Sequence, residues 1–299
     1  MTAKYRKALE DGILRDRIEK ARQVLEECTL CPRQCRVNRL KEETGICSTG
    51  TRAVLASFGP HFGEEPPLTG RNGSGTIFFS FCNLLCCFCQ NHDISHKGEG
   101  EEVTPDRIAS VMIHLEQIGC HNINLVTPTH VVPRILEAVE TAAGSGLSIP
   151  IVYNSGGYDS VETLKLLDGI VDIYMPDFKF FDSKTAKLLC NAPDYPETAQ
   201  KAIREMYRQT GDLKVDENGI AVSGLLVRHL VMPEGLSGTD RVMKFLAEEI
   251  SPLTCVNVMS QYRPCGSARK IDAVSGRPTT EEFRRALETA RDLKLNVIS

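Results

Sequence analysis

Six short apolar runs, separated by helical patterns, constrain the fold of this chain more than any other feature. The runs are TIFFSF (76–81), NINLVTP (122–128), IPIVYNS (149–155), DIYMPDF (172–178), GLLVRHLV (224–231) and TCVNVMS (254–260). Short continuous apolar runs are typical of strands that are buried on both faces. Because strands that alternate with helices pair in parallel through right-handed crossovers, we expect an α/β fold.

The number of strand–helix units limits the possible architectures. A closed barrel of the TIM type needs eight strand–helix units, so six units predict a partial (β/α)6 TIM-like barrel whose open mouth can admit a large partner. A doubly wound open sheet is the competing architecture, and periodicity does not separate the two. We assign four regions: an N-terminal helix and Cys-rich extension, a Gly/Pro-rich connector read as irregular chain, the barrel, and a C-terminal helical segment, at 1–57, 58–75, 76–262 and 263–299.

Composition and charge exclude several classes of protein. The chain has 299 residues and a net charge of −4, which argues against a general nucleic-acid surface or an anionic-membrane patch. The first residues, MTAKYRKALEDG, contain no apolar run, and no stretch of about 18 apolar residues occurs, so we expect neither a signal peptide nor a membrane span. Twelve cysteines without an export signal indicate reduced thiols in a cytoplasmic protein.

Three cysteines stand directly after the first predicted barrel strand, where such folds place their chemistry. Cys82, Cys86 and Cys89 have the spacing C-x3-C-x2-C. A four-iron cluster normally takes four cysteines, so three thiolates leave one iron open to a ligand, as in catalytic metal sites. Cys87 is adjacent to Cys86 and should point elsewhere and pack. The alternative is a closed structural site made by all four cysteines.

The segment CNLLCCFC resembles the signature of the radical S-adenosylmethionine superfamily, with Phe88 as the aromatic residue before the last cysteine. The resemblance covers about residues 76–262. It implies a [4Fe-4S] cluster on Cys82, Cys86 and Cys89, with S-adenosyl-L-methionine on the open iron. It also implies reductive cleavage of that cofactor to a 5′-deoxyadenosyl radical that abstracts hydrogen, with electrons from a flavodoxin or ferredoxin.

A longer stretch of sequence indicates a particular family within this superfamily. HFGEEPPLTGRNGSGTIFFSFCNLLCCFCQNHDIS is similar to an uncharacterised branch of the pyruvate formate-lyase activating enzymes. Those activating enzymes remove a glycine α-hydrogen from a glycyl radical enzyme, which is therefore an implied protein substrate. Radical modification of a small molecule or another target is the first alternative. An iron–sulfur electron carrier without turnover is the alternative from a different class.

The same resemblance suggests residues for the polar ends of the cofactor. MPDFKF matches an Asp-x-Lys pair of the activating enzymes, and Asp177 and Lys179 would share one strand face. The alternative is an ordinary salt bridge between these two residues at the end of a strand. GLLVRHLVMPEG puts Arg228 inside the barrel, where a guanidinium needs an anion, either the cofactor carboxylate or a protein carboxylate. Asn154 and Ser155 stand where the activating enzymes carry an acidic contact.

Two segments depart from the family pattern. TPTH (127–130) replaces a Gly-Gly-Glu segment and loses the close backbone approach of glycine, and His130 is expected at the start of a helix. SQYRPCG replaces a Tyr-His pair near the last strand, so we expect Gln261 and Tyr262 to face the cavity instead. Both departures are compatible with cofactor cleavage and leave the substrate open.

A second cysteine group precedes the barrel. CTLCPRQCRVNRLKEETGIC has the spacing C-x2-C-x3-C-x11-C, which predicts a closed four-thiolate site for zinc or a second [4Fe-4S] cluster, formed by Cys28, Cys31, Cys35 and Cys47. Its role would be structural or electron-relaying; the alternative is four unconnected thiols. We expect single packing thiols at the remaining positions, Cys120, Cys190, Cys255 and Cys265.

Overall fold

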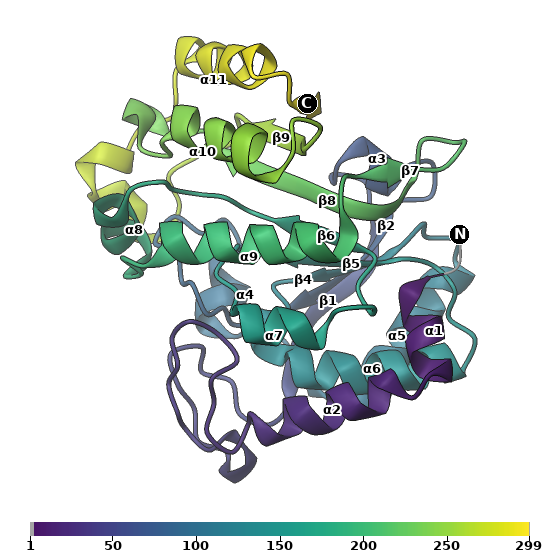
Figure 1. The fold of residues 1–299 in the computed structure, drawn as a ribbon. Coiled ribbons are helices and arrows are strands. Elements are labelled where there is room, and N and C mark those ends of the chain that lie inside the picture. Colours follow the sequence, from purple (N-terminus) through teal and green to yellow (C-terminus); the bar gives the residue numbers. More distant parts are fainter. Residues whose placement is uncertain (1–2, 299) are drawn as a thin grey trace.

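One mixed sheet of 10 strands organises the computed structural model, which describes residues 3–298 (Figure 1). Its strand order is β10-β9-β8-β6-β5-β4-β2-β1-β3, with β7 paired to β8. The strands are β1 (Ala53–His61), β2 (Ser74–Phe79), β3 (Glu101–Val103), β4 (Ile123–Val126), β5 (Ile151–Ser155), β6 (Ile173–Pro176), β7 (Lys214–Val215), β8 (Ala221–Leu230), β9 (Cys255–Met259) and β10 (Asn296–Ile298).

The parallel part of the sheet confirms the predicted partial barrel. Strands β2, β4, β5, β6, β8 and β9 pair in parallel, and each of the six predicted runs overlaps one of them. Neighbouring strands follow the order of the chain, whereas a doubly wound sheet reverses its order at a switch point. Within the described residues β10 and β3 end the sheet without pairing to each other, so the barrel is open.

Helices cover the sheet, and Figure 1 shows α6, α7 and α9 along one side of it. Thr104 caps α5 as its side chain accepts a hydrogen bond from Arg107 N at 3.3 Å. No helix among residues 3–298 has the length and apolar character needed to span a bilayer. The helices are α1 (Lys4–Glu10), α2 (Ile13–Gln23), α3 (Pro66–Thr69), α4 (His92–Lys97), α5 (Pro105–Gln117), α6 (Val132–Gly144), α7 (Val161–Leu166), α8 (Ser183–Cys190), α9 (Tyr195–Thr210), α10 (Thr239–Phe245) and α11 (Thr280–Asp292).

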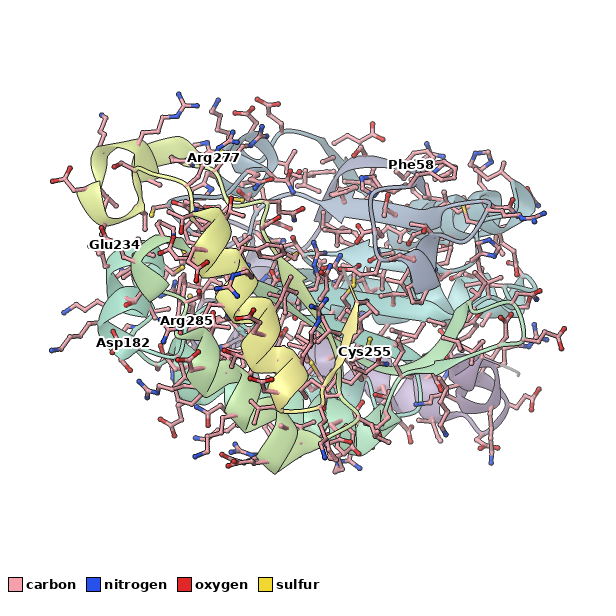
Figure 2. The ribbon with its side chains drawn as sticks, turned by 90° about the horizontal axis from the view of Figure 1, so that it is seen from above. Phe58, Asp182, Glu234, Cys255, Arg277 and Arg285 are labelled. Atoms are coloured by element: carbon pink, nitrogen blue, oxygen red, sulfur yellow. The ribbon has the colours of Figure 1, made fainter. Side chains whose placement is uncertain are left out.

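The connector at 58–75 is more ordered than its composition suggests. Strand β1 runs to His61, α3 follows, and β2 begins at Ser74, so the expectation of irregular chain is wrong at both ends of the segment. Pro60 is tolerated because β3 pairs only with Ala53–Leu55, which leaves the β1 edge unpaired at the proline. The C-terminal segment contains α11, as expected, and also the edge strand β10. Seen from above, Phe58 on β1 and Asp182 before α8 lie at opposite margins (Figure 2).

The N-terminal helices are fixed to the amino ends of the barrel strands. The backbone N–H of Lys4 donates to Asp172 Oδ1 at 2.8 Å, just before β6. Tyr5 Oη donates to the carbonyl of Ile149 at 2.9 Å, just before β5. Asp172 Oδ2 also accepts from Ile151 N at 2.9 Å. These contacts place α1 at the end of the barrel opposite the one where the chemistry of such barrels occurs.

The cysteine-rich segment after α2 is attached to the barrel through a buried arginine. Arg39 is only 2% exposed. Its Nε and Nη2 donate to the Gly50 carbonyl at 2.9 and 2.7 Å, and its Nη1 donates to the His130 carbonyl at 2.8 Å. A single guanidinium therefore closes the segment on itself and ties it to the turn before α6.

We predict that Arg39→Ala lowers the free energy of unfolding by about 3 kcal/mol, because two buried carbonyls lose charged donors. Urea denaturation followed by circular dichroism measures the change. Arg36→Ala is the matched control: the Arg36 side chain is 62% exposed and pairs only with Glu27, so its effect should stay under about 0.5 kcal/mol. Equal unfolding midpoints for the two variants would contradict the role assigned to Arg39.

Candidate active site

A cavity of about 390 Å³ opens at the carboxyl ends of the parallel strands. The loop after β2 and the loop between β1 and β2 form part of its walls. The carboxyl ends of β4, β5 and β8 and the segment after β6 form another part. The structure brings every predicted residue of the barrel site to this cavity, namely Cys82, Cys86, Cys89, Asn154, Ser155, Asp177, Lys179 and Arg228.

The loop after β2 separates the three lining cysteines from Cys87. Cys87 does not line the cavity; its side chain packs against the core, and its N–H donates to the Leu189 carbonyl at 2.8 Å. The loop turns sharply because Phe81 and Leu85 adopt φ values of 67° and 53°. The expectation that Cys87 points away from the other three cysteines and packs is thus confirmed.

Each lining thiol has a polar neighbour. Leu84 N donates to Cys82 Sγ at 3.4 Å, and Ser95 Oγ donates to Cys89 Sγ at 3.2 Å. Cys190 Sγ at the end of α8 lies 3.3 Å from Cys86 Sγ and lowers the pKa of Cys86 by hydrogen bonding. The expectation that Cys190 is an isolated packing thiol is therefore wrong. Cys120 and Cys255 are buried in the core, as expected, and Figure 2 shows Cys255 between the two margins of the molecule.

The chemistry of these thiols fits an iron–sulfur cluster. Burial raises the pKa of Cys82 to about 12, so its thiolate forms only when positive charge enters the cavity. Among residues 3–298, no three His, Cys, Asp or Glu side chains converge closely enough to hold a single metal ion. Three thiols that line one cavity are a ligand set that an iron–sulfur cluster can use.

Asp177 and Lys179 form an ion pair on the cavity wall just after β6. Lys179 Nζ lies 2.5 Å from Asp177 Oδ2. Burial lowers the pKa of Lys179, but the charges of Asp177 and Cys86 outweigh it and raise the pKa above the ordinary value. Tyr195 Oη fixes the segment, because it accepts from Lys179 N at 2.9 Å and contacts the Asp177 carbonyl at 3.0 Å. Sequence patterns gave no sign of this tyrosine.

The end of β5 approaches the same segment through a glycine. Gly157 has φ of 75°, and a Cβ there would lie 2.1 Å from the Asp177 carbonyl oxygen, so only glycine fits. Ser155 lines the cavity, but its hydroxyl donates to the buried Asp159 at 2.6 Å and accepts from Gly157 N at 3.2 Å. Its hydrogen bonds are used within the protein. The amide of Asn154 has no hydrogen-bond partner among the described side-chain contacts, which leaves it available to a ligand.

Arg228 is paired with protein carboxylates rather than left free. Its Nη1 lies 3.4 Å from Glu64 Oε2, and its Nε lies 3.4 Å from Glu65 Oε1 and 3.8 Å from Asp177 Oδ1. Asn257 Nδ2 also donates to Glu65 Oε1 at 2.7 Å. Burial raises the pKa of Glu64 to about 7. Both glutamates belong to the segment HFGEEPP, to which sequence reasoning assigned no side-chain role.

The two departures from the family pattern have different outcomes. Thr127 lines the cavity with φ of 60°, a left-handed conformation that is rare for a β-branched residue. His130 lies in the turn that leads into α6 and contacts the Ser80 carbonyl at 2.8 Å, so its expected place at a helix start is confirmed. Gln261 lines the cavity, as expected. Tyr262 does not: its Oη donates to the Val274 carbonyl at 2.7 Å, and its ring packs on Phe88.

The N-terminal cysteines gather in the loop after α2. Cys28 and Cys31 are buried, whereas Cys35 and Cys47 are half-buried. Ile46 N donates to Cys35 Sγ at 3.4 Å, which joins the two ends of the group. All twelve cysteines of the chain are free thiols.

Comparison with known proteins agrees with the geometry. The sequence model of the Radical SAM superfamily matches residues 76–216, which include the three lining cysteines, Asp177 and Lys179. An uncharacterized protein of Methanocaldococcus jannaschii, MJ0674, is 32% identical over 300 residues, covering 97% of this chain and 82% of the relative. The chain belongs to the radical SAM superfamily.

Proposed function

We propose that this protein cleaves S-adenosyl-L-methionine reductively and uses the resulting radical to take an α-hydrogen from a glycine of a partner protein. The observation that carries the proposal is one cavity that holds both three thiols and an aspartate–lysine pair. Superfamily membership supports radical chemistry with this cofactor in general. The glycine target is inferred from the resemblance to the activating enzymes and from the open barrel.

The polar wall of the cavity suits the amino-acid end of the cofactor. Asp177 can accept from the cofactor ammonium, and Lys179 can pair with its carboxylate, with the Asn154 amide beside them. Arg228 holds Asp177 from the side of β8, so it acts by positioning rather than by a free guanidinium. A [4Fe-4S] cluster on Cys82, Cys86 and Cys89, when bound, supplies the electron that breaks the sulfonium bond.

Apolar side chains complete the cavity and protect radical chemistry from water. Phe79, Leu84 and Ile94 line it near the cysteines, and Val126 lines it at the end of β4. Such a lining removes water from the reacting atoms and limits side reactions.

The open edge of the barrel favours a protein partner. His61, Gly63 and Glu64 form part of the cavity wall, and Phe62 between them is 65% exposed. A peptide loop can therefore reach the cavity past an exposed aromatic ring. The electron-carrier alternative explains less, because a carrier has no use for the Asp177–Lys179 pair beside its cluster.

For the N-terminal group we propose a second [4Fe-4S] cluster rather than zinc. Four cysteines within one short loop supply a complete ligand set for a cluster. A reduced flavodoxin or ferredoxin would be the electron donor, in keeping with free thiols and a cytoplasmic location.

We expect Cys86→Ala to abolish formation of 5′-deoxyadenosine by reconstituted, dithionite-reduced protein, because the remaining two thiols cannot hold the cluster. Chromatography of the quenched reaction measures the product. Cys87→Ala is the matched control, since the adjacent thiol points away from the cavity, and its product yield should remain close to that of the unchanged protein. Full activity of the Cys86 variant would exclude the three-cysteine site.

Lys179→Met should weaken cofactor binding about 30-fold, because about 2 kcal/mol of charge-assisted hydrogen bonding is lost. Isothermal titration of the oxidised, cluster-loaded protein measures the affinity without turnover. Lys184→Met, at an exposed position of α8, is the control and should bind like the unchanged protein. An unaltered affinity of the Lys179 variant would mean that the ion pair is only structural.

The glycine target is tested by incubating active protein with a glycyl radical enzyme from the same genome. A glycine-centred radical signal in electron paramagnetic resonance is the expected result. If 5′-deoxyadenosine forms but no partner gains the signal, the cleavage stands and the glycine target is wrong. Deuterium transfer from a labelled small molecule into 5′-deoxyadenosine would then identify a different substrate.

A further inference from the structure

We propose that the N-terminal cysteine centre is the point at which the electron enters this protein, and that the contact of Arg33 with the loop after Cys82 holds this centre beside the cluster in the barrel. The inference rests on the proposed function, since it assumes a cluster at each cysteine group. It goes further by giving the N-terminal segment a direction of electron flow and a defined contact with the barrel site.

The two cysteine groups meet at Asn83. Arg33, two residues after Cys31, donates from its Nε to the Asn83 carbonyl at 3.0 Å. Asn83 directly follows Cys82 and is only 3% exposed. Its Nδ2 donates to the Tyr158 carbonyl at 2.7 Å, which holds the side chain in place. The segment that carries Cys31 is thus hydrogen-bonded to the residue that follows Cys82.

Arg33 clamps the two groups together. Its Nε and Nη2 donate at 3.0 and 3.3 Å to the carbonyls of Asn83 and Leu84, in the loop between Cys82 and Cys86. Its Nη2 and Nη1 donate at 2.9 and 2.6 Å to the carbonyls of Cys190 and Asn191. The guanidinium also lies 5.2 Å from the centre of the Tyr158 ring.

This clamp reaches both sides of the barrel site. Asn83 and Leu84 lie in the loop that carries Cys82, and the Cys190 side chain contacts Cys86. Thr163 of α7 adds a hydrogen bond of 2.7 Å to the Leu30 carbonyl, next to Cys31. Figure 1 shows the loop after α2 beside α7. So many polar contacts on one arginine indicate a fixed distance between the two groups.

The exposure of the N-terminal cysteines indicates the direction of electron flow. Cys35 and Cys47 are half-buried, and Ile46 between them is 45% exposed, so a docked donor can approach this side. Cys28 and Cys31 are each only 8% exposed and lie on the inner side. In the proposed step a flavin hydroquinone gives up one electron and becomes a semiquinone. The N-terminal centre accepts that electron and passes it on, so the centre is regenerated and the cluster on Cys82, Cys86 and Cys89 is reduced.

The test uses Cys35→Ala/Cys47→Ala, which removes the outer ligands and leaves the contact with Asn83. Cys120→Ala is the control, because Cys120 is buried away from both groups. Iron, sulfide and zinc are counted after reconstitution. Stopped-flow absorbance then follows reduction of the barrel cluster by flavodoxin hydroquinone, with dithionite as a small reductant that needs no docking site.

We expect the double variant to lose about four iron atoms, to be reduced at least tenfold more slowly by flavodoxin, and to reach the same final reduction with dithionite. The control should match the unchanged protein in all three measurements. The proposed electron path would be overturned if flavodoxin reduced the double variant as fast as the unchanged protein. It would also be overturned if the N-terminal site of the unchanged protein contained zinc.

A second variant covers the case in which the double variant loses both clusters. Arg33→Gln keeps all seven ligands but breaks the clamp, so flavodoxin-driven reduction should slow while the iron content is unchanged. An unchanged rate of reduction by flavodoxin would again contradict the proposed electron path. By contrast, absence of 5′-deoxyadenosine from the unchanged protein with dithionite would contradict the proposed function, whatever the flavodoxin rates.

Discussion

The burial of three thiols in one cavity is the constraint on which the rest of the site depends. A buried thiolate is unfavourable without positive charge, and burial alone raises the pKa of Cys82 to about 12. The loop therefore aims polar donors at the sulfurs, with Leu84 N at Cys82 and Ser95 at Cys89. The ammonium of Lys179 adds positive charge near Cys86. A metal cluster supplies the remainder, so cluster binding and folding of the loop are coupled.

In the proposed function, the charges on the opposite wall complement the cofactor. Asp177, Glu64 and Glu65 face Lys179 and Arg228, which leaves one surplus negative charge when all five are ionised. S-adenosyl-L-methionine carries one net positive charge, from a sulfonium, an ammonium and a carboxylate. Since burial raises the pKa of Glu64 to about 7, this glutamate can be neutral before the cofactor arrives and ionise when it binds. The wall can thus stay electrically balanced in both states.

Local patterns predicted the parts that depend on local sequence, and tertiary contacts decided the rest. The six parallel strands and the cysteine loop follow from apolar runs and spacing within a few residues. Strand β1 was missed because its Gly59 and Pro60 resemble a loop, and only its edge position makes the proline acceptable. Glu64 reaches the cavity and Cys190 reaches Cys86 from remote segments, whereas the Tyr262 hydroxyl donates to the Val274 carbonyl. The spacing of residues in the sequence does not predict such contacts between remote segments.

Backbone strain at the cavity explains why the N-terminal segment is attached so firmly. Phe81, Leu85 and Thr127 hold left-handed conformations without being glycine, each at a cost of about 1–3 kcal/mol. Such conformations persist only when surrounding contacts over-determine them. Arg33 holds the carbonyl of Leu84, the residue before Leu85, and Arg39 holds the carbonyl of His130, in the turn that follows Thr127. The cysteine-rich extension thereby stabilises the strained loops on two sides of the cavity, and that role is independent of which metal it binds.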